Sequence, residues 1–88
     1  MGGELETRVV HQIVADGLAP YVGASMARAS VNGHIDKLGV SGSIITPSQI
    51  DTLLERLGPG LRVFIGPVRG GEVVEEIREK LLAAGRGR

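Results

Sequence analysis

The stretch "IITPSQI", residues 44–50, holds several start signals of an α-helix within a few positions. Thr46 is a favourable N-cap, Pro47 suits the first helical turn, and Gln49 completes a capping box with Thr46. The isoleucines before the cap and at the fourth helical position have the spacing of a hydrophobic staple. We therefore interpret the stretch as architectural, and it predicts that the chain is built from helices.

Apolar residues recur at spacings of three and four on both sides of this stretch, which is typical of helices with a buried face. Pro20 is predicted to open a second helix, since the residue before a proline disfavours helical dihedrals. Gly58-Pro59-Gly60 is predicted to end the third helix, and a glycine-rich loop at 66–72 is predicted to lead into the last one. The four segments with helical periodicity are 4–18, 20–38, 46–57 and 72–84.

The segment 20–38 carries two apolar stripes, so it is predicted to be the central helix, buried on a wide arc. Asn32-Gly33 within it is also a strong hairpin signal, which would pair residues 29–31 with 34–36 as strands. We favour the helix because a stripe runs through both sides of the dipeptide, although Gly33 costs a helix about 1 kcal/mol. The stripes comprise Ala24, Ala27, Val31, Ile35 and Leu38, and Leu18, Val22, Met26 and Ala29.

The segment 61–65 is also ambiguous, because Leu61, Val63 and Ile65 alternate as they would in a strand. A short helix fits the same residues, and we favour it since the chain offers no second convincing strand as a pairing partner. No repeat period is visible in the sequence.

The length of 88 residues allows a single domain, and an apolar share of 42% is ordinary for a globular chain. The expected fold is all-α: a compact bundle of four to five short helices over residues 4–85. Residues 1–3 are expected to form a flexible N-terminus and residues 86–88 a disordered tail.

The charges of the chain balance, with ten basic and ten acidic residues scattered along it. This balance disfavours a nucleic-acid partner, because such binding depends on clustered lysine and arginine. The chain has no cysteine, which favours a cytoplasmic location. It also has no run of about 18 apolar residues that would span a membrane.

Few groupings in the sequence suit catalysis or ligand binding. His34 and Asp36 lie two positions apart, and such residues point away from each other on a helix, so they make a poor metal site. The predicted loop at 66–72 matches neither a P-loop nor a dinucleotide fingerprint. We therefore predict no enzyme activity, no catalytic residue, no cofactor and no metal.

Tyr21 and Phe64 are the only aromatic residues, and a core as aliphatic as this one does not require them. Aromatic and arginine side chains are the usual anchors of protein interfaces. We therefore predict a partner-binding set of Tyr21, Arg28, Arg62 and Phe64, although for Phe64 alone we favour a place in the protein core over the interface.

Short features follow one another along the chain in an order that resembles a known family. An early Leu-x-x-Tyr-Val-Gly stretch precedes an alanine-rich helix, and a Thr-led helix with leucines and a Gly-Leu segment precede a last amphipathic helix. The residues concerned are Leu18, Tyr21, Val22, Gly23 and Ala27, then Thr46, Leu53, Leu54, Gly60 and Leu61. This order resembles small helical modules at the C-terminal ends of bacterial signalling proteins, next to kinase or receiver domains. The resemblance implies an interaction or oligomerisation role and carries over no catalytic residue.

The favoured function is a non-catalytic protein–protein interaction or self-association module, in bacterial signalling as the resemblance implies. Its partner would be another protein or a second copy of the chain. The first alternative is a helix-turn-helix DNA-binding domain, in which the Thr46-led helix presents Ser48, Gln49 and Thr52 to the bases. The second alternative is a small ligand-binding domain.

Overall fold

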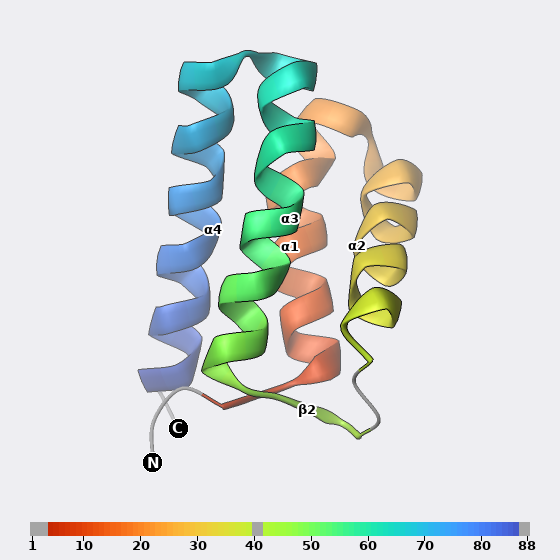
Figure 1. Cartoon of the computed structure of the whole chain (residues 1–88), viewed down its shortest axis with the longest axis vertical. Helices are drawn as coiled ribbons and strands as arrows, with labels where there is room; N and C mark the ends of the chain where they lie inside the picture. The colour runs from red at the N-terminus through yellow and green to blue at the C-terminus, as the bar shows by residue number, and fades with distance from the viewer. Residues whose placement is uncertain (1–3, 40–41, 87–88) are drawn as a thin grey trace.

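The computed structural model describes residues 4–39 and 42–86, the last of these by its backbone alone. Four helices run alongside one another, and a short pair of strands crosses one end of them (Figure 1). The longest helix has 20 residues and so spans about 30 Å, most of the 35 Å length of the molecule. The elements are β1 (Leu5–Glu6), α1 (Thr7–Val22), α2 (Ala24–Leu38), β2 (Ile44–Ile45), α3 (Pro47–Ile65) and α4 (Pro67–Arg86).

The predicted all-α class holds for the described residues, in which four helices dominate and a two-stranded sheet accompanies them. Residues 29–36 are helical within α2, and Asn32-Gly33 does not form a hairpin. The capping box at the start of α3 is also present. The N–H of Gln49 donates to Thr46 Oγ1 at 3.3 Å, and the N–H of Thr46 donates to Gln49 Oε1 at 2.9 Å. Both isoleucines of the predicted staple are buried.

A pair of short strands, which the helical prediction did not include, joins the starts of α1 and α3. The strands β1 and β2 are antiparallel, with Leu5 opposite Ile45. Both of these side chains are buried, so each strand places one apolar residue under the helices. The N–H of Thr7 donates to the carbonyl of Ser43 at 2.7 Å, which satisfies one main-chain group at the start of α1. The first helix therefore begins at Thr7 and not at the predicted residue 4.

The chain consists of two similar halves, each a strand followed by two helices, although the sequence showed no repeat period. The two helices of each half meet at a single glycine, Gly23 or Gly66, with φ of 90° and 96°. Only glycine adopts this conformation without strain. Tyr21-Val22 precedes the first junction and Phe64-Ile65 the second. The repeat was missed because the match between the halves is limited to a few positions around the glycines.

Two predicted helix boundaries are wrong, because proline and glycine lie inside continuous helices. α1 runs through Pro20, and α3 runs through Gly58-Pro59-Gly60. Residues 61–65 therefore form the last turns of α3 instead of a separate short helix. The apolar stripe of α3 continues across the proline, since Leu57 and Leu61 are both buried. Burying two leucines at about 1.5–3 kcal/mol each offsets the cost of roughly 3 kcal/mol for a proline inside a helix.

The glycine-rich loop predicted at 66–72 is instead helical from Pro67 onward and forms the first turns of α4. Gly70 lies against the main chain of α3, and a Cβ atom at this position would lie 2.9 Å from the Cα of Arg62. The glycine is thus required for the close approach of α3 and α4. Sequence reasoning had instead interpreted this glycine as the sign of a loop.

The outer limits of the predicted domain are tested only in part. α4 continues past residue 85 to the backbone of Arg86, which was predicted to lie in the tail. The predicted flexible N-terminus at 1–3 and the rest of the predicted tail at 87–88 lie outside the described residues. In the part of the chain that the structure describes, no helix combines the length and apolar character needed to cross a membrane.

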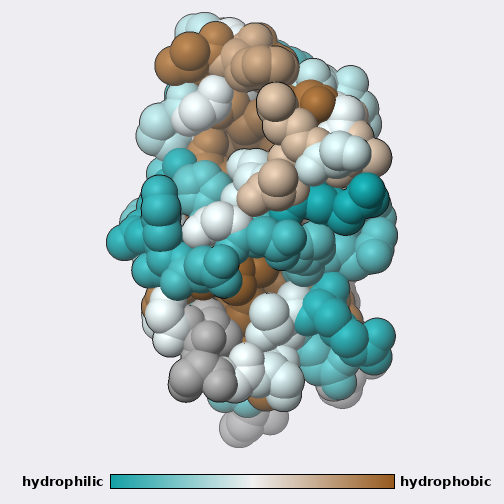
Figure 2. Space-filling model, turned by 90° about the vertical axis from the view of Figure 1, so that its right-hand side faces the viewer, coloured by the Kyte–Doolittle hydropathy of each residue, from teal (hydrophilic) through white to brown (hydrophobic). Residues whose placement is uncertain are grey.

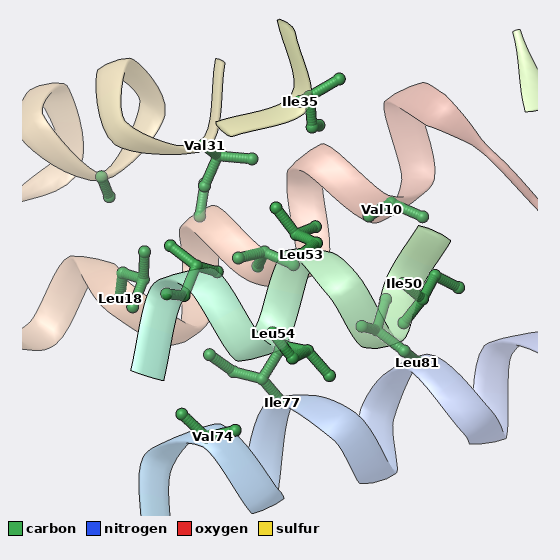
Figure 3. Close-up of a cluster of buried hydrophobic side chains, with 14 of the residues drawn as sticks. Val10, Leu18, Val31, Ile35, Ile50, Leu53, Leu54, Val74, Ile77 and Leu81 are labelled. Carbon is green, nitrogen blue, oxygen red and sulfur yellow. The ribbon is translucent and has the colours of Figure 1, made fainter. Parts of the chain in front are cut away.

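The centre of the core is α3 and not α2, which corrects the prediction of a central helix at 20–38. Six residues of α3 are buried, whereas α2 buries three. Side chains from all four helices meet around α3, and Leu54 and Ile77 face each other between α3 and α4 (Figure 3). α2 is therefore an outer helix, and much of its surface is left uncovered by the rest of the chain.

Candidate functional site

Exposed apolar side chains gather at the end of the molecule where both helix pairs turn. Met26, Val63, Phe64 and Val68 are 58%, 89%, 60% and 75% exposed, and all four lie near the two glycine junctions in the chain. Figure 2, which views the molecule from the α2 side, shows apolar surface in the upper half, above a band of hydrophilic side chains. Exposed apolar patches of this kind commonly mark interaction sites.

A groove between α2 and α3 opens in this region and has a volume of about 200 Å³. We call it the α2–α3 groove. One wall continues from the end of α1 into α2, and the other is the facing side of α3. The first wall consists of Val22, Met26, Ser30 and His34, the second of Arg56, Leu57, Gly60, Leu61 and Phe64, and Leu18 completes the lining. The groove is therefore apolar along most of its length and polar near His34 and Arg56.

The polar end of the groove contains an unsatisfied buried atom. His34 Nδ1 is buried and has no hydrogen-bond partner among the described residues. Burial, followed by the positive charges of Lys37 and Arg56, lowers the pKa of His34 below its usual 6.5. The imidazole is therefore mainly neutral near a pH of about 7, and the two cations give this end of the groove a positive potential.

The contact between α1 and α4 occupies the place that corresponds, in the two-fold repeat, to the α2–α3 groove. Here the two described helices pack together without a groove between them. We call this contact the α1–α4 seam. Aligning the two glycine junctions places Gly60 on Gly17 and His34 on Ile77. Ile77 is buried, and an added Cβ at Gly17 would lie only 2.6 Å from its Cγ1 atom. An added Cβ at Gly60 would have no neighbour within 4 Å, so the same position in the α2–α3 groove is uncovered.

The same alignment places Tyr21 on Phe64 and Arg69 on Met26. In the α1–α4 seam, Arg69 donates a hydrogen bond to the Tyr21 hydroxyl, and its guanidinium lies 5.5 Å from the centre of the ring. Arg69 also pairs with Glu72 at 3.1 Å. The bonds with Glu72 and then Tyr21 raise the pKa of Arg69 above its usual value. The corresponding Phe64 and Met26 of the α2–α3 groove have no such polar contact to make, and both are mostly exposed.

The four predicted partner-binding residues do not line a common site. Phe64 lies in the wall of the α2–α3 groove, and its exposure shows that the favoured place in the core is wrong. Tyr21 is half-buried in the α1–α4 seam. Arg28 is exposed beside a shallow depression between α1 and α2, and Arg62 is exposed on α3 next to Gly70. Only Phe64 of the predicted set therefore belongs to the groove.

Sequence reasoning missed the other groove residues that matter for binding, namely Met26, His34, Arg56 and Gly60. One signal for them was present in the second apolar stripe, which continues from the end of α1 into α2. That stripe was interpreted as a sign of deep burial, yet Met26 on it is 58% exposed. A stripe of apolar residues shows that a surface is suited to packing but does not show whether the same chain covers it.

The side chains considered for DNA reading, and the histidine and aspartate judged a poor metal site, have the following surroundings. Gln49 is engaged in the capping box of α3, and the Thr52 hydroxyl donates to the Ser48 carbonyl at 3.1 Å. His34 lines the α2–α3 groove, whereas Asp36 is exposed. Among the described residues, no three histidine, cysteine, aspartate or glutamate side chains are grouped so that they could hold a metal ion.

Comparison with known proteins found no match to any protein-family model, any curated protein or any solved structure. The α2–α3 groove is therefore assigned as the candidate site from the exposure, shape and charge of its own residues. Its walls are apolar, its centre is unfilled, and one end is positive. This combination can receive side chains from another molecule.

Proposed function

We propose that the protein is a non-catalytic interaction module that binds a protein partner, or a second copy of itself, through the surface around the α2–α3 groove. The observation that carries this proposal is the exposure of Met26 and Phe64 beside an unfilled apolar groove. A partner that covers such side chains gains about 25 cal/mol for each Å² of apolar surface removed from water. The proposal includes the role in bacterial signalling that the sequence resemblance implies.

The composition of the exposed surface supports a protein partner over a nucleic acid. The groove walls combine an aromatic ring, a methionine and leucines, and aromatic residues and methionine are enriched at protein interfaces. Nucleic-acid binding depends instead on a band of cations, and two candidate base-reading side chains of α3 are engaged in local hydrogen bonds. The same groove offers no metal-ligating group of residues for a bound ion.

A peptide-display selection on the immobilised chain tests the proposal, with counter-selection on a Phe64→Asp variant. Because Phe64 is mostly exposed, an aspartate at this position removes apolar contact surface and leaves the core intact. We expect peptides that bind the natural chain and lose about tenfold or more in affinity on the variant. Circular dichroism of both proteins is the control, since equal helicity shows that the variant is folded.

Light scattering on the purified chain distinguishes a second copy from another partner. A dimer that becomes a monomer in the Phe64→Asp variant would support self-association through this surface. A monomeric chain that selects no Phe64-dependent peptide would contradict the proposed function. Tyr21→Ala in the same assays tests the other predicted aromatic anchor, because loss of binding with unchanged helicity would extend the surface to the α1–α4 seam.

A further inference from the structure

We infer that the α2–α3 groove receives an amphipathic helix of a partner protein, with an aliphatic side chain in its apolar part and an aspartate or glutamate facing Arg56 and His34. This inference rests on the proposed function and adds the binding mode and the chemistry of the partner. Its basis is the spacing of the groove walls, the volume of the groove, the charge at its polar end and the contrast with the α1–α4 seam.

The spacing of the wall residues is suited to a helical partner. Residues of the first wall follow one another at intervals of four, and the apolar residues of the second wall at intervals of four and three. Rows with these spacings are the ridges of a helix surface, and a third helix packs its own ridge between two of them. An apolar groove between two helices is accordingly the site used in the helix-in-groove mode of recognition.

The volume of the groove suits side chains better than a free small molecule. About 200 Å³ is less than the roughly 300–1,000 Å³ that is typical of small-molecule pockets. The α1–α4 seam shows what fills the corresponding space within this chain, because Ile77 packs directly on Gly17 there. An aliphatic side chain that approached Gly60 would make the same kind of contact in the α2–α3 groove, where nothing of this chain lies within 4 Å of the Cβ position.

The charge at the polar end of the groove favours an acidic residue on the partner. Arg56 faces His34 from α3, and Lys37 acts on it from α2 itself. A carboxylate beside these groups would be attracted by two cations. His34 is mainly neutral near a pH of about 7, so the attraction comes from Arg56 and Lys37. By contrast, two arginines of α4 are already paired with carboxylates, Arg69 with Glu72 and Arg78 with Asp51.

Two synthetic peptides of about 16 residues, long enough to form a helix on binding, test the inference. Both carry leucines at helical spacing on one face, and the flanking positions are glutamate in one peptide and lysine in the other. We expect the acidic peptide to bind at least about tenfold more tightly than the basic one, and its affinity to fall as salt is added. Fluorescence anisotropy of the labelled peptides measures both affinities on the full chain.

Substitutions in the chain locate the binding. Gly60→Leu fills the α2–α3 groove with an aliphatic side chain of the protein itself and is expected to abolish binding of the acidic peptide. Arg56→Glu reverses the charge at the polar end and is expected to weaken the acidic peptide about tenfold and to strengthen the basic one. Lys80→Glu, a matched charge reversal on the exposed side of α4, is expected to leave both affinities unchanged.

Equal binding of the two peptides, or undiminished binding of the acidic peptide to Gly60→Leu, would overturn the inference. If circular dichroism shows that Gly60→Leu does not fold, the affinity of the acidic peptide for the Arg56→Glu variant tests the inference instead. Undiminished affinity for that variant would overturn it. Display-selected peptides that depend on Phe64 but not on Arg56 or Gly60 would leave the proposed function standing and refute this inference alone. A monomeric chain that binds neither selected nor designed peptides would refute both.

Discussion

In the α1–α4 seam Ile77 packs on Gly17, whereas in the α2–α3 groove His34 occupies the corresponding position and leaves Gly60 uncovered. The two surfaces lie in equivalent places of the two halves, after equivalent glycine junctions. Their backbones therefore follow the same plan, and the difference between a sealed and an open surface comes from a few side chains.

The comparison teaches that the fold itself does not require an open groove. The α1–α4 seam shows that an aliphatic residue opposite a glycine closes the gap, yet the α2–α3 groove has a histidine with an unsatisfied nitrogen there. A protein selected only for stability would close both surfaces. Departures from the most stable choice are expected where a protein binds something, and substitutions at equivalent positions can test whether this is such a place.

The largest difference in the loss of stability is expected between the variants Ile77→Ala and His34→Ala. Ile77 is 1% exposed, so its truncation leaves a cavity in the α1–α4 seam and is expected to lower the free energy of unfolding by about 2–5 kcal/mol. His34 lines an open groove, and its truncation is expected to cost less than about 1 kcal/mol. Urea unfolding followed by circular dichroism measures both. Equal costs would mean that the groove is packed as tightly as the seam.

The next pair of variants is Gly17→Ala and Gly60→Ala, which are expected to change the free energy of unfolding in opposite directions. A Cβ at Gly17 would lie 2.6 Å from Ile77 Cγ1, so overpacking is expected to destabilise the chain by about 1–3 kcal/mol. At Gly60 nothing lies within 4 Å, so alanine is expected to stabilise α3 by up to about 1 kcal/mol through its higher helix propensity. Melting temperatures of the two variants show the signs directly, and destabilisation by both would refute the assignment of the groove as unfilled.

A smaller difference is expected between the two equivalent aromatic residues. Tyr21 is half-buried and packs against the core, so Tyr21→Ala is expected to lower the stability by about 1–2 kcal/mol. Phe64 is 60% exposed, so Phe64→Ala is expected to change the stability by less than about 0.5 kcal/mol. Thermal melting of the two variants checks the order. A larger loss for Phe64→Ala would place its ring in the folded core and remove it from the binding surface.

The smallest effect concerns the pH dependence of stability. His34 has a folded-state pKa below 6.5, mainly because of burial and then because of Lys37 and Arg56. The unfolded chain therefore takes up a proton more readily, so the free energy of unfolding falls as the pH drops from 6.5 towards the lowered pKa. His34→Gln is expected to reduce the difference in stability between about pH 7.5 and about pH 5. Urea unfolding at both pH values measures this difference. If it is the same in His34→Gln as in the natural chain, His34 has the same pKa in the folded and the unfolded chain, which would contradict the prediction.

The helical class of the fold was predictable because its signals are local. The capping box joins Thr46 to a residue three positions away, and the apolar stripes repeat once per helical turn. The strand pair was not predictable in the same way, since Leu5 and Ile45 become neighbours only after two helices have folded between them. The helices likewise continue through Pro20 and Pro59 because distant residues bury their apolar faces, which overrides the local preference.

Phe64 is the one residue of the candidate site that the predicted partner-binding set contains, because its aromatic ring is unusual in this chain, although the core was its favoured place. Met26 belongs to a stripe that is visible in the sequence, but its exposure depends on how far apart α2 and α3 lie. Gly17 and Gly60 illustrate the same limit, because both are helical glycines and only the three-dimensional structure shows that one is covered and the other is not.

The most direct test of the account is a methyl NMR titration of the chain with the acidic leucine peptide. The account predicts that the methyl signals of Met26, Leu57 and Leu61, which line the α2–α3 groove, shift as the peptide is added, while those of Val73 and Ile77 stay in place. Shifts centred on Val73 and Ile77, or no shift at a saturating concentration of peptide, would contradict it.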